Sequence, residues 1–246
     1  MKHASAPPHI LLLPGNMCDE RLWQGGNDII GQRLVGLGHK VSLVDFKLDA
    51  TIEAMAKRAL SVCDGLIVPI GFSMGGIVAL EMVRQDPHRI AALGLIDTTS
   101  RPDTRSVERL RQQDDIRHGL LAQVVTQELK PNYLAPCHAQ NLALLSLLTD
   151  MAMQLGPDVF ISQSEALRTR ADLTPVLSRL IVPVFMACGA HDTLCPPALH
   201  RGMAALMSDV QLHVIEDAGH ILPLEQPEKL SELLADFLSS IRGTNL

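Results

Sequence analysis

A serine set between glycines is the strongest chemical signal in the chain. Ser73 lies in the segment 71–76 (GFSMGG), directly after the apolar run 66–70 and before a helical pattern at 75–85. A serine on a sharp turn from a strand into a helix is exposed at the helix N-terminus, where backbone N–H groups stabilise developing negative charge. Glycines two residues before and after it let neighbouring elements pass close to the turn. The pattern predicts that Ser73 is a nucleophile; a chance serine in a glycine-bearing loop is the alternative.

A serine hydroxyl needs a base to take its proton, and histidine is the usual choice. His220 comes just after the last strand candidate, in a loop that leads to a helix, whereas His200 and His213 fall inside a helix and a strand candidate and are expected to be structural. Six others in polar or terminal segments are expected at the surface: His3, His9, His39, His88, His118 and His138. Ligands bind at the ends of strands in open parallel sheets. His220 is therefore predicted to be the general base.

An acid must orient this imidazole and stabilise its charged form. Asp192 follows the strand candidate 182–187 and precedes His220 by enough residues for one helix and one strand between them. Asp97 follows an earlier strand candidate and is the rival acid, whereas Asp217 is too close to His220 along the same loop. Ser73, Asp192 and His220 follow one another in a chain order known for such triads, so we expect Asp192 to be the acid and keep Asp97 as the alternative.

Two backbone N–H groups should face the oxygen that becomes negative when a carbonyl is attacked. Met74, the residue after the nucleophile, is predicted to supply one of them. Asn16, in the loop after the strand candidate 10–13, is predicted to supply the other. A plain glycine turn at Gly15 is the alternative interpretation of this loop.

The segments that carry these residues alternate between strand and helix patterns. Apolar runs predict six strands, at 10–13, 41–46, 66–70, 91–96, 182–187 and 211–215. Such continuous runs are typical of strands buried on both faces of a parallel sheet. Helix patterns lie between them, at 27–36, 51–63, 75–85, 197–207 and 227–239. The alternation predicts an α/β fold with a doubly wound, mostly parallel sheet of about six strands.

The stretch 100–179 interrupts this alternation. It has no strand pattern and is rich in helix formers, as in 106–129 and 139–155. Because both flanks belong to one sheet pattern, we expect a helical lid inserted into a core made of 1–99 and 180–246. Six side chains are candidates for substrate binding, with helix packing as the alternative role for most of the lid residues: Met17, Leu121, Tyr133, Leu145, Leu148 and Ile221.

The composition restricts the class of protein. The 246 residues, 47% hydrophobic and 20% charged, fit one globular α/β domain. A net charge of -6 gives no reason to expect a nucleic acid or an anionic membrane as a partner, and no apolar run reaches the ~20 residues that span a bilayer. Five scattered cysteines without a C-x-x-C pair, and no export signal, predict a cytoplasmic protein without a metal site. The oligomeric state is not readable, so a homodimer is left open.

Four segments together resemble the α/β-hydrolase superfamily, and the resemblance runs from about 10 to 237. They are 12–15 leading to Trp23, 71–76, 189–192 with Pro196, and 218–220 leading to Pro227. Within the superfamily the chain resembles compact carboxylesterases, enol-lactonases and C–C hydrolases with a lid after the fourth core strand. The resemblance implies a substrate channel under the lid and no cofactor. Many members have a histidine where this chain has Pro14, and many begin with an antiparallel hairpin, which we expect to be absent here.

The expected activity is that of a serine hydrolase that cleaves a small, mainly apolar carboxylic ester through an acyl-enzyme. Because only 3% of the residues are aromatic, the pocket is expected to be aliphatic. The expected partners are a small-molecule ester or lactone and water. A lactonase and a C–C bond hydrolase with the same three residues are alternatives, as is a non-catalytic ligand-binding protein of the same fold.

Overall fold

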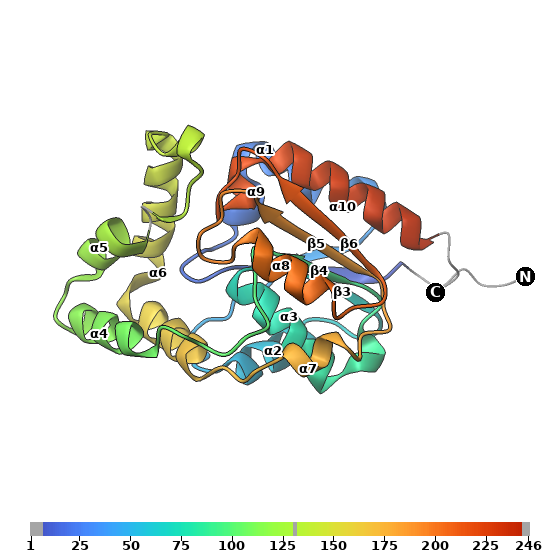
Figure 1. Cartoon of the computed structure of the whole chain (residues 1–246), viewed down its shortest axis with the longest axis horizontal. Helices are drawn as coiled ribbons and strands as arrows, with labels where there is room; N and C mark the ends of the chain where they lie inside the picture. The colour runs from blue at the N-terminus through green and yellow to red at the C-terminus, as the bar shows by residue number, and fades with distance from the viewer. Residues whose placement is uncertain (1–6, 130–131, 243–246) are drawn as a thin grey trace, which may run out of the picture.

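A six-stranded parallel sheet lies at the centre of the computed structural model, which describes residues 7–129 and 132–242 (Figure 1). The strands are β1 (His9–Leu13), β2 (Val41–Leu43), β3 (Ile67–Phe72), β4 (Leu93–Ile96), β5 (Val184–Gly189) and β6 (Val210–Ile215). They pair in the order β2-β1-β3-β4-β5-β6, and every pairing among them is parallel. The sheet confirms the predicted α/β fold, and the described residues contain no antiparallel hairpin before β1.

The order in which strands are added reverses at β1. This strand pairs with β2 on one side and with β3 on the other, where Leu13 lies opposite Gly71. A crevice forms at the carboxyl ends of two neighbouring strands where the strand order reverses. The loop with Asn16 follows β1 and the turn with Ser73 follows β3, so the topology brings these two residues to the same place.

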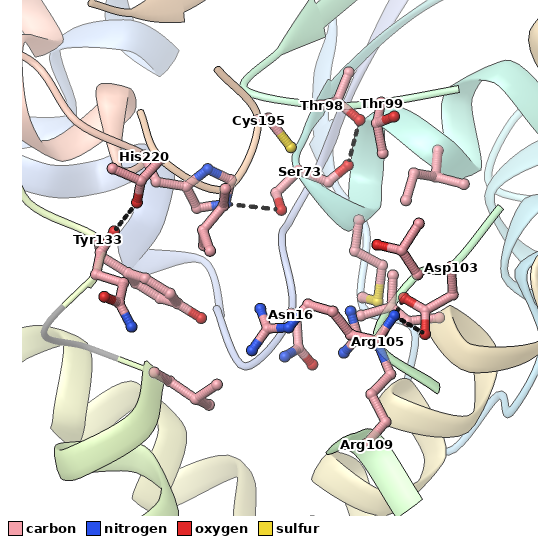
Figure 2. A pocket seen from close by; sticks show the side chains of 18 of the residues that line it. Asn16, Ser73, Thr98, Thr99, Asp103, Arg105, Arg109, Tyr133, Cys195 and His220 are labelled. Atoms are coloured by element: carbon pink, nitrogen blue, oxygen red, sulfur yellow. Dashed lines mark hydrogen bonds and ion pairs between the residues drawn. The ribbon is translucent and has the colours of Figure 1, made fainter. Parts of the chain in front are cut away.

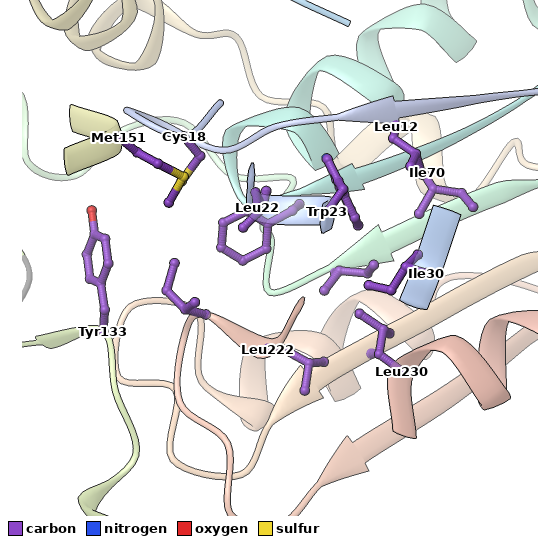
Figure 3. Close-up of a cluster of buried hydrophobic side chains, with 14 of the residues drawn as sticks. Leu12, Cys18, Leu22, Trp23, Ile30, Ile70, Tyr133, Met151, Leu222 and Leu230 are labelled. Atoms are coloured by element: carbon purple, nitrogen blue, oxygen red, sulfur yellow. The ribbon is translucent and has the colours of Figure 1, made fainter. Parts of the chain in front are cut away.

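Helices cover both faces of this sheet (Figure 1). The elements α1 (Arg21–Gly36) and α10 (Pro227–Arg242) contribute to one apolar cluster, which Figure 3 shows in part. The elements α2 (Ile52–Leu60), α3 (Met74–Gln85) and α8 (Pro197–Ala204) contribute to the other. Alternate residues of β1 enter the two clusters: Ile10 and Leu12 pack with α1 and α10, whereas Leu11 and Leu13 pack with α2 and α3. This is the period of two expected of a strand. Burial on both faces explains why the sequences of the strands are continuous apolar runs.

Two element boundaries differ clearly from the prediction. The helix α1 begins at Arg21 rather than at 27, and β2 ends at Leu43 rather than at 46. The start of α1 carries only a weak sequence signal, because Asp19 Oδ1 accepts the N–H of Arg21 at 3.0 Å but two glycines follow inside the helix.

Two histidines that were expected at the surface are buried. His9 Nε2 lies 2.9 Å from Ser42 Oγ, across the β1–β2 pair, and His39 Nδ1 donates to Pro8 O at 3.1 Å. A polar ring can be buried when such hydrogen bonds compensate for lost water. The prediction of a surface position is therefore wrong for both, and His3 lies outside the described residues.

The described chain between β4 and β5 contains helices and loops but no strand. Most of its helices lie to one side of the sheet, whereas the last one lies next to α3 (Figure 1). This stretch contains α4 (Ser106–Arg117), α5 (Leu121–Gln123), a π-helical turn η2 (Val124–Leu129), η4 (Pro136–His138), α6 (Leu142–Thr169) and α7 (Thr174–Leu177). The short turns η1 (Pro87–Arg89) and α9 (Leu222–Glu225) lie elsewhere in the chain.

The helix α6 is much longer than predicted because it consists of two helices joined at a kink. Gly156 has a φ of 83° and is followed by Pro157. Among the described residues, α6 is the one helix whose length and composition would allow it to cross a membrane. The kink divides it into two shorter helices, and both halves bury side chains, as at Leu148 and Phe160. A straight span needs ~20 residues, so α6 is weak evidence for a membrane segment.

Candidate active site

Ser73 occupies the turn between β3 and α3. Its φ of 50° is a left-handed conformation that residues other than glycine rarely adopt. Ser73 N–H donates to Ile96 O at 2.9 Å, and Thr98 Oγ1 donates to Ser73 O at 2.7 Å. These bonds to the end of β4 hold the strained turn at the carboxyl edge of the sheet. Strained residues of this kind gather at functional sites.

Two glycines allow the turn to pack closely. A Cβ atom added at Gly71 would overlap the backbone carbonyl group of Gly75. A Cβ atom added at Gly75 would overlap the carbonyl group of Leu13, at the end of β1. The glycines on each side of Ser73 are therefore required by backbone contacts, as the sequence pattern predicted.

His220 links Ser73 to Asp192. Ser73 Oγ donates to His220 Nε2 across 3.0 Å, and His220 Nδ1 donates to Asp192 Oδ2 across 2.8 Å. Asp192 follows β5 and His220 follows β6, so both come from strand ends at the same edge of the sheet. The structure thus brings together, in one hydrogen-bonded chain, the three side chains predicted to be catalytic. Figure 2 shows the link between Ser73 and His220.

Asp192 is surrounded by groups that favour its ionised form. Its Oδ1 accepts hydrogen bonds from the N–H groups of Leu194 (2.8 Å) and Cys195 (2.9 Å). Burial alone would raise the pKa of Asp192, but His220 and these two N–H groups lower it below its ordinary value. Asp192 is therefore a carboxylate when it faces the imidazole.

Asp97, the rival acid, has the opposite character. Its oxygens accept from Gly189 N–H at 2.9 Å and from Leu222 N–H at 3.3 Å, and it makes no hydrogen bond to His220 in the part of the chain that the structure describes. Burial, together with the charge of Asp192, raises the pKa of Asp97 well above its ordinary value. Asp97 thus keeps its proton to a higher pH than an ordinary aspartate, and Asp192 is the carboxylate that contacts His220.

Two aromatic rings flank the imidazole of His220. The ring centroid of Phe72 lies 5.3 Å away and that of Tyr133 lies 5.5 Å away. The backbone N–H of His220 also donates to Tyr133 O at 2.7 Å. The histidine loop is therefore tied to the helical stretch between β4 and β5.

A buried glutamate strengthens this connection. Glu225 Oε2 accepts the N–H of Gly219, directly before His220, and Glu225 Oε1 accepts the N–H of Ala135, both at 2.7 Å. His138 Nδ1 also lies 3.1 Å from Oε1. One side chain thus fixes both the loop that holds the imidazole and the segment that covers it.

Asn16 and Met74 lie on the wall of the same cavity as Ser73 (Figure 2 labels Asn16). Neither backbone N–H group donates to another described residue. Met74 is the first residue of α3, where N–H groups have no partner within the helix. By contrast, the N–H of Met17 donates to Gln163 Oε1 at 2.8 Å. The loop after β1 therefore leaves Asn16 available as a donor, but not Met17.

A cavity of about 230 Å³ opens in front of Ser73 and His220. Thr98, Thr99 and Asn132 contribute polar groups to its lining, and Leu129 and Leu167 contribute apolar ones. Its charged residues are Asp103, Arg105, Arg109, Glu128 and Arg170. The lining is therefore mixed, with a charged side that the aliphatic pocket predicted from the sequence did not include.

The residues predicted to bind substrate require a correction. Tyr133 lines the cavity, but the other five do not: Met17, Leu121, Leu145, Leu148 and Ile221. Four of them are buried in the apolar core, and Leu145 is half-buried on α6. Apolar side chains at helical spacing attach a helix to its neighbours, and this packing role is what the structure shows for the lid leucines.

Sequence reasoning missed the charged side of the cavity. Arg105 directly precedes α4, and Arg109 follows four residues later, near the start of that helix. That spacing was the available signal. Asp103 lies two residues before Arg105, whereas Arg170, directly after α6, joins this group only through the fold.

Cys195 lies beside the hydrogen-bonded chain. Ligand atoms of Asp192, Cys195 and His220 lie within 4.8 Å of one another, a spacing that could suit a metal ion. Burial raises the pKa of the Cys195 thiol well above its ordinary value, and the thiolate is the form that attacks or binds metals. His220 Nδ1 is already engaged with Asp192. The donor set therefore fits a neutral thiol next to a serine site better than it fits a metal centre.

Comparison with known proteins gives a consistent result. The model of the Alpha/beta hydrolase family matches residues 10–233. The pimeloyl-[acyl-carrier protein] methyl ester esterase of Methylococcus capsulatus is 29% identical over 95% of both chains. A thermophilic esterase from Thermogutta terrifontis, solved with malate bound, has a TM-score of 0.86 at 26% identity and covers 96% of this chain and 91% of its own. The enol-lactonase of Burkholderia xenovorans, at 21% identity, shares the fold with a TM-score of 0.78 over 97% and 94% of the two chains.

Proposed function

The chain belongs to the alpha/beta hydrolase family and is a hydrolase acting on ester bonds, and on that premise we propose that it cleaves a small carboxylic ester through an acyl-enzyme on Ser73. The observation that carries this proposal is the unbroken hydrogen-bonded chain from Ser73 through His220 to Asp192. This is the arrangement that converts a weakly nucleophilic hydroxyl into an effective one.

In the first half of the proposed reaction, Ser73 Oγ attacks the carbonyl carbon of the ester. His220 Nε2 takes the hydroxyl proton, and Asp192 stabilises the imidazolium that forms. The carbonyl oxygen becomes negative and accepts hydrogen bonds from the N–H groups of Asn16 and Met74. The imidazolium then gives its proton to the leaving alcohol, and the acyl group stays on Ser73.

In the second half, His220 takes a proton from water as the water oxygen attacks the acyl-enzyme. The same two N–H groups stabilise the second tetrahedral intermediate. His220 then returns the proton to Ser73 Oγ, which releases the carboxylic acid product and restores the enzyme. A lactone is a cyclic ester and would follow the same steps, with acid and alcohol in one product.

The division into core and lid is part of this proposal. We propose that 100–179 form a lid on a core made of 1–99 and 180–246, since this stretch supplies one wall of the cavity, including Tyr133 and the charged residues. The volume of about 230 Å³ lies below the ~300–1,000 Å³ typical of drug-sized pockets, which supports a small substrate. The charged lining does not support the mainly apolar ester expected from composition.

A panel of short methyl esters and small lactones tests the proposed function. The purified protein should hydrolyse at least one class, and Ser73→Ala should reduce kcat by about 10³–10⁶-fold while circular dichroism stays unchanged. Malate, which is bound in the structure of the Thermogutta esterase, belongs in the assay as an inhibitor. Turnover that persists in Ser73→Ala would remove Ser73 from the mechanism.

A further inference from the structure

Two arginine side chains on the cavity wall share a single carboxylate. Arg109 Nε donates to Asp103 Oδ1 at 3.1 Å, and Arg170 Nη1 donates to the same oxygen at 3.0 Å. The exposed fractions of these side chains are 16% for Arg109, 8% for Arg170 and 2% for Asp103. Two guanidinium groups and one carboxylate leave one net positive charge in a largely buried cluster. Such a charge is costly unless an anion approaches it.

Arg109 and Arg170 differ in their remaining N–H groups. Arg170 donates further to the carbonyl oxygens of Arg101, Pro102 and Leu167. Nη1 and Nη2 of Arg109 donate to no other residue of the described chain, although Arg109 lines the cavity. A guanidinium presents its N–H groups in a rigid fork that matches the two oxygens of a carboxylate. Arg109 therefore has unused donors of the right geometry for such an anion.

The neighbouring acidic side chains already have partners. Glu108 accepts two hydrogen bonds from Arg105, at 2.7 and 2.5 Å, and Glu128 forms an ion pair with Arg111. Both glutamates are partly exposed, so solvent and salt weaken their influence on the buried cluster. Neither one supplies the missing counter-charge.

The cationic cluster and the reacting groups face the same space. Figure 2 shows Asp103, Arg105 and Arg109 on the side of the pocket opposite His220 and Tyr133. Ser73 opens into the same cavity, whose volume of about 230 Å³ leaves room only for a short molecule between the two ends. A substrate bound there would have its ester at one end and an anionic group at the other.

We propose that Arg109 binds a carboxylate of the substrate, so that the substrate is a short ester that carries a free carboxylate remote from the scissile bond. This inference rests on the proposed function and names its substrate class. Asp103 and Arg170 hold Arg109 in position, and the carboxylate supplies the negative charge that the cluster lacks. The bonds made and broken at Ser73 are unchanged, because the free carboxylate takes no part in them.

Matched pairs of esters test the proposal on the unmodified protein. The monomethyl esters of malonate, succinate and glutarate differ from methyl propionate, butyrate and valerate only in a carboxylate that replaces a methyl group. The best charged ester should exceed its neutral partner in kcat/KM by about tenfold or more, measured by titration of released acid at constant pH. 4-Acetoxybutanoate is an isomer of monomethyl glutarate that carries the carboxylate on its alcohol part instead of its acyl part. Comparing kcat/KM for these two esters shows which side of the scissile ester the cluster binds.

Arg109→Gln tests the residue itself. The ratio of kcat/KM for the charged ester over its neutral partner should fall about 10- to 100-fold, mainly through KM. Arg109→Lys keeps the charge without the fork and should give an intermediate ratio. Arg117→Gln is the matched control, because Arg117 is an exposed arginine on the same helix, outside the cavity lining, and its loss should leave the ratio unchanged.

The outcomes separate this proposal from the proposed function. A wild-type protein that hydrolyses both series without preferring the carboxylate esters overturns the anion subsite and leaves the esterase standing. A folded Arg109→Gln variant with an unchanged ratio of kcat/KM for the charged over the neutral ester also overturns the anion subsite alone. If Ser73 reacts with a fluorophosphonate but no ester of either series is cleaved, the substrate class is wrong; if Ser73 does not react either, the proposed function fails. The wild-type preference needs no variant, so poor folding of Arg109→Gln leaves the proposal testable.

Discussion

Asp97 and Asp192 are neighbouring buried aspartates that hold their protons differently. Asp192 Oδ2 accepts a hydrogen bond from His220 Nδ1 at 2.8 Å, while the oxygens of Asp97 accept only from backbone N–H groups. The pKa of Asp97 is raised by burial and by the charge of Asp192, whereas His220 and two N–H groups keep the pKa of Asp192 low. Asp97 therefore keeps its proton to a higher pH than Asp192 does, and Asp192 is the carboxylate that faces the imidazole.

This difference predicts unequal effects of two matched substitutions. Asp192→Asn should reduce kcat by about 10³–10⁴-fold, because an amide no longer fixes the imidazole tautomer or stabilises its charged form. Asp97→Asn keeps the shape of a side chain that accepts hydrogen bonds from Gly189 and Leu222 rather than from His220, and it should reduce kcat by about tenfold or less. The measurement is kcat on one methyl ester for both variants. Equal losses would assign Asp97 a share in orienting the imidazole.

The raised pKa of Asp97 also predicts how stability depends on pH. An aspartate in the unfolded chain titrates near ~3.9. The folded protein keeps the proton of Asp97 to a higher pH than the unfolded chain does. The contribution of Asp97 to the free energy of unfolding is therefore complete below ~3.9 and is lost as the pH rises through the pKa of Asp97 in the folded state. Asp192, with a lowered pKa, contributes above ~3.9 and loses its contribution as pH falls.

Asp97→Asn removes the first of these two titrations. The free energy of unfolding, measured in urea at a series of pH values above about 4, should decline less steeply in the variant than in the wild type. Parallel curves for the two proteins would show that Asp97 is ionised in the folded state.

Gly75→Ala tests the close packing of the turn at Ser73. The new Cβ would overlap the carbonyl group of Leu13, so we expect a loss of about 1–3 kcal/mol or more in the free energy of unfolding, even though alanine favours helices. Gly202→Ala in α8 is the matched control, because its Cβ would meet nothing within 4 Å. The control should stabilise the protein by about 0.5–1 kcal/mol. If both substitutions changed the free energy of unfolding in urea in the same direction, the close packing of the turn would be contradicted.

Glu225→Gln tests the link between the histidine loop and the segment that covers it. Glutamine offers one oxygen in place of two, so the N–H of either Gly219 or Ala135 loses its acceptor. We expect a loss of about 1–3 kcal/mol in stability and a lower kcat, because Gly219 precedes His220. Glu216→Gln, on the exposed turn after β6, should change stability by less than about 0.5 kcal/mol. An unchanged kcat in Glu225→Gln would limit this residue to a structural role.

The sheet and the positions of Ser73 and His220 could be predicted because they depend on local signals. Continuous apolar runs mark buried parallel strands, and glycines around Ser73 mark a turn that needs close backbone contacts. The spacing could not separate Asp192 from Asp97, since both follow strands at the same edge of the sheet. That choice depends on which carboxylate reaches His220 Nδ1, and only the folded structure shows it.

The cavity could not be predicted for a different reason. A leucine such as Leu148 has the same spacing whether it faces a pocket or packs against a neighbouring helix, and here it packs in the core. Arg109 and Arg170 come from segments far apart in the chain and meet only because α4 and the end of α6 both reach Asp103. Such a charged cluster leaves no periodic pattern in the sequence.

The central claim, that His220 activates Ser73, is tested most directly by reaction with a fluorophosphonate followed by peptide mass spectrometry. The wild-type protein should carry one adduct, on Ser73, and Ser73→Ala should carry none. His220→Ala, which retains the serine, should form the adduct far more slowly, because the proton of Ser73 Oγ has no acceptor. An unmodified Ser73 in the folded wild-type protein, or equal rates of labelling in wild type and His220→Ala, would contradict the claim.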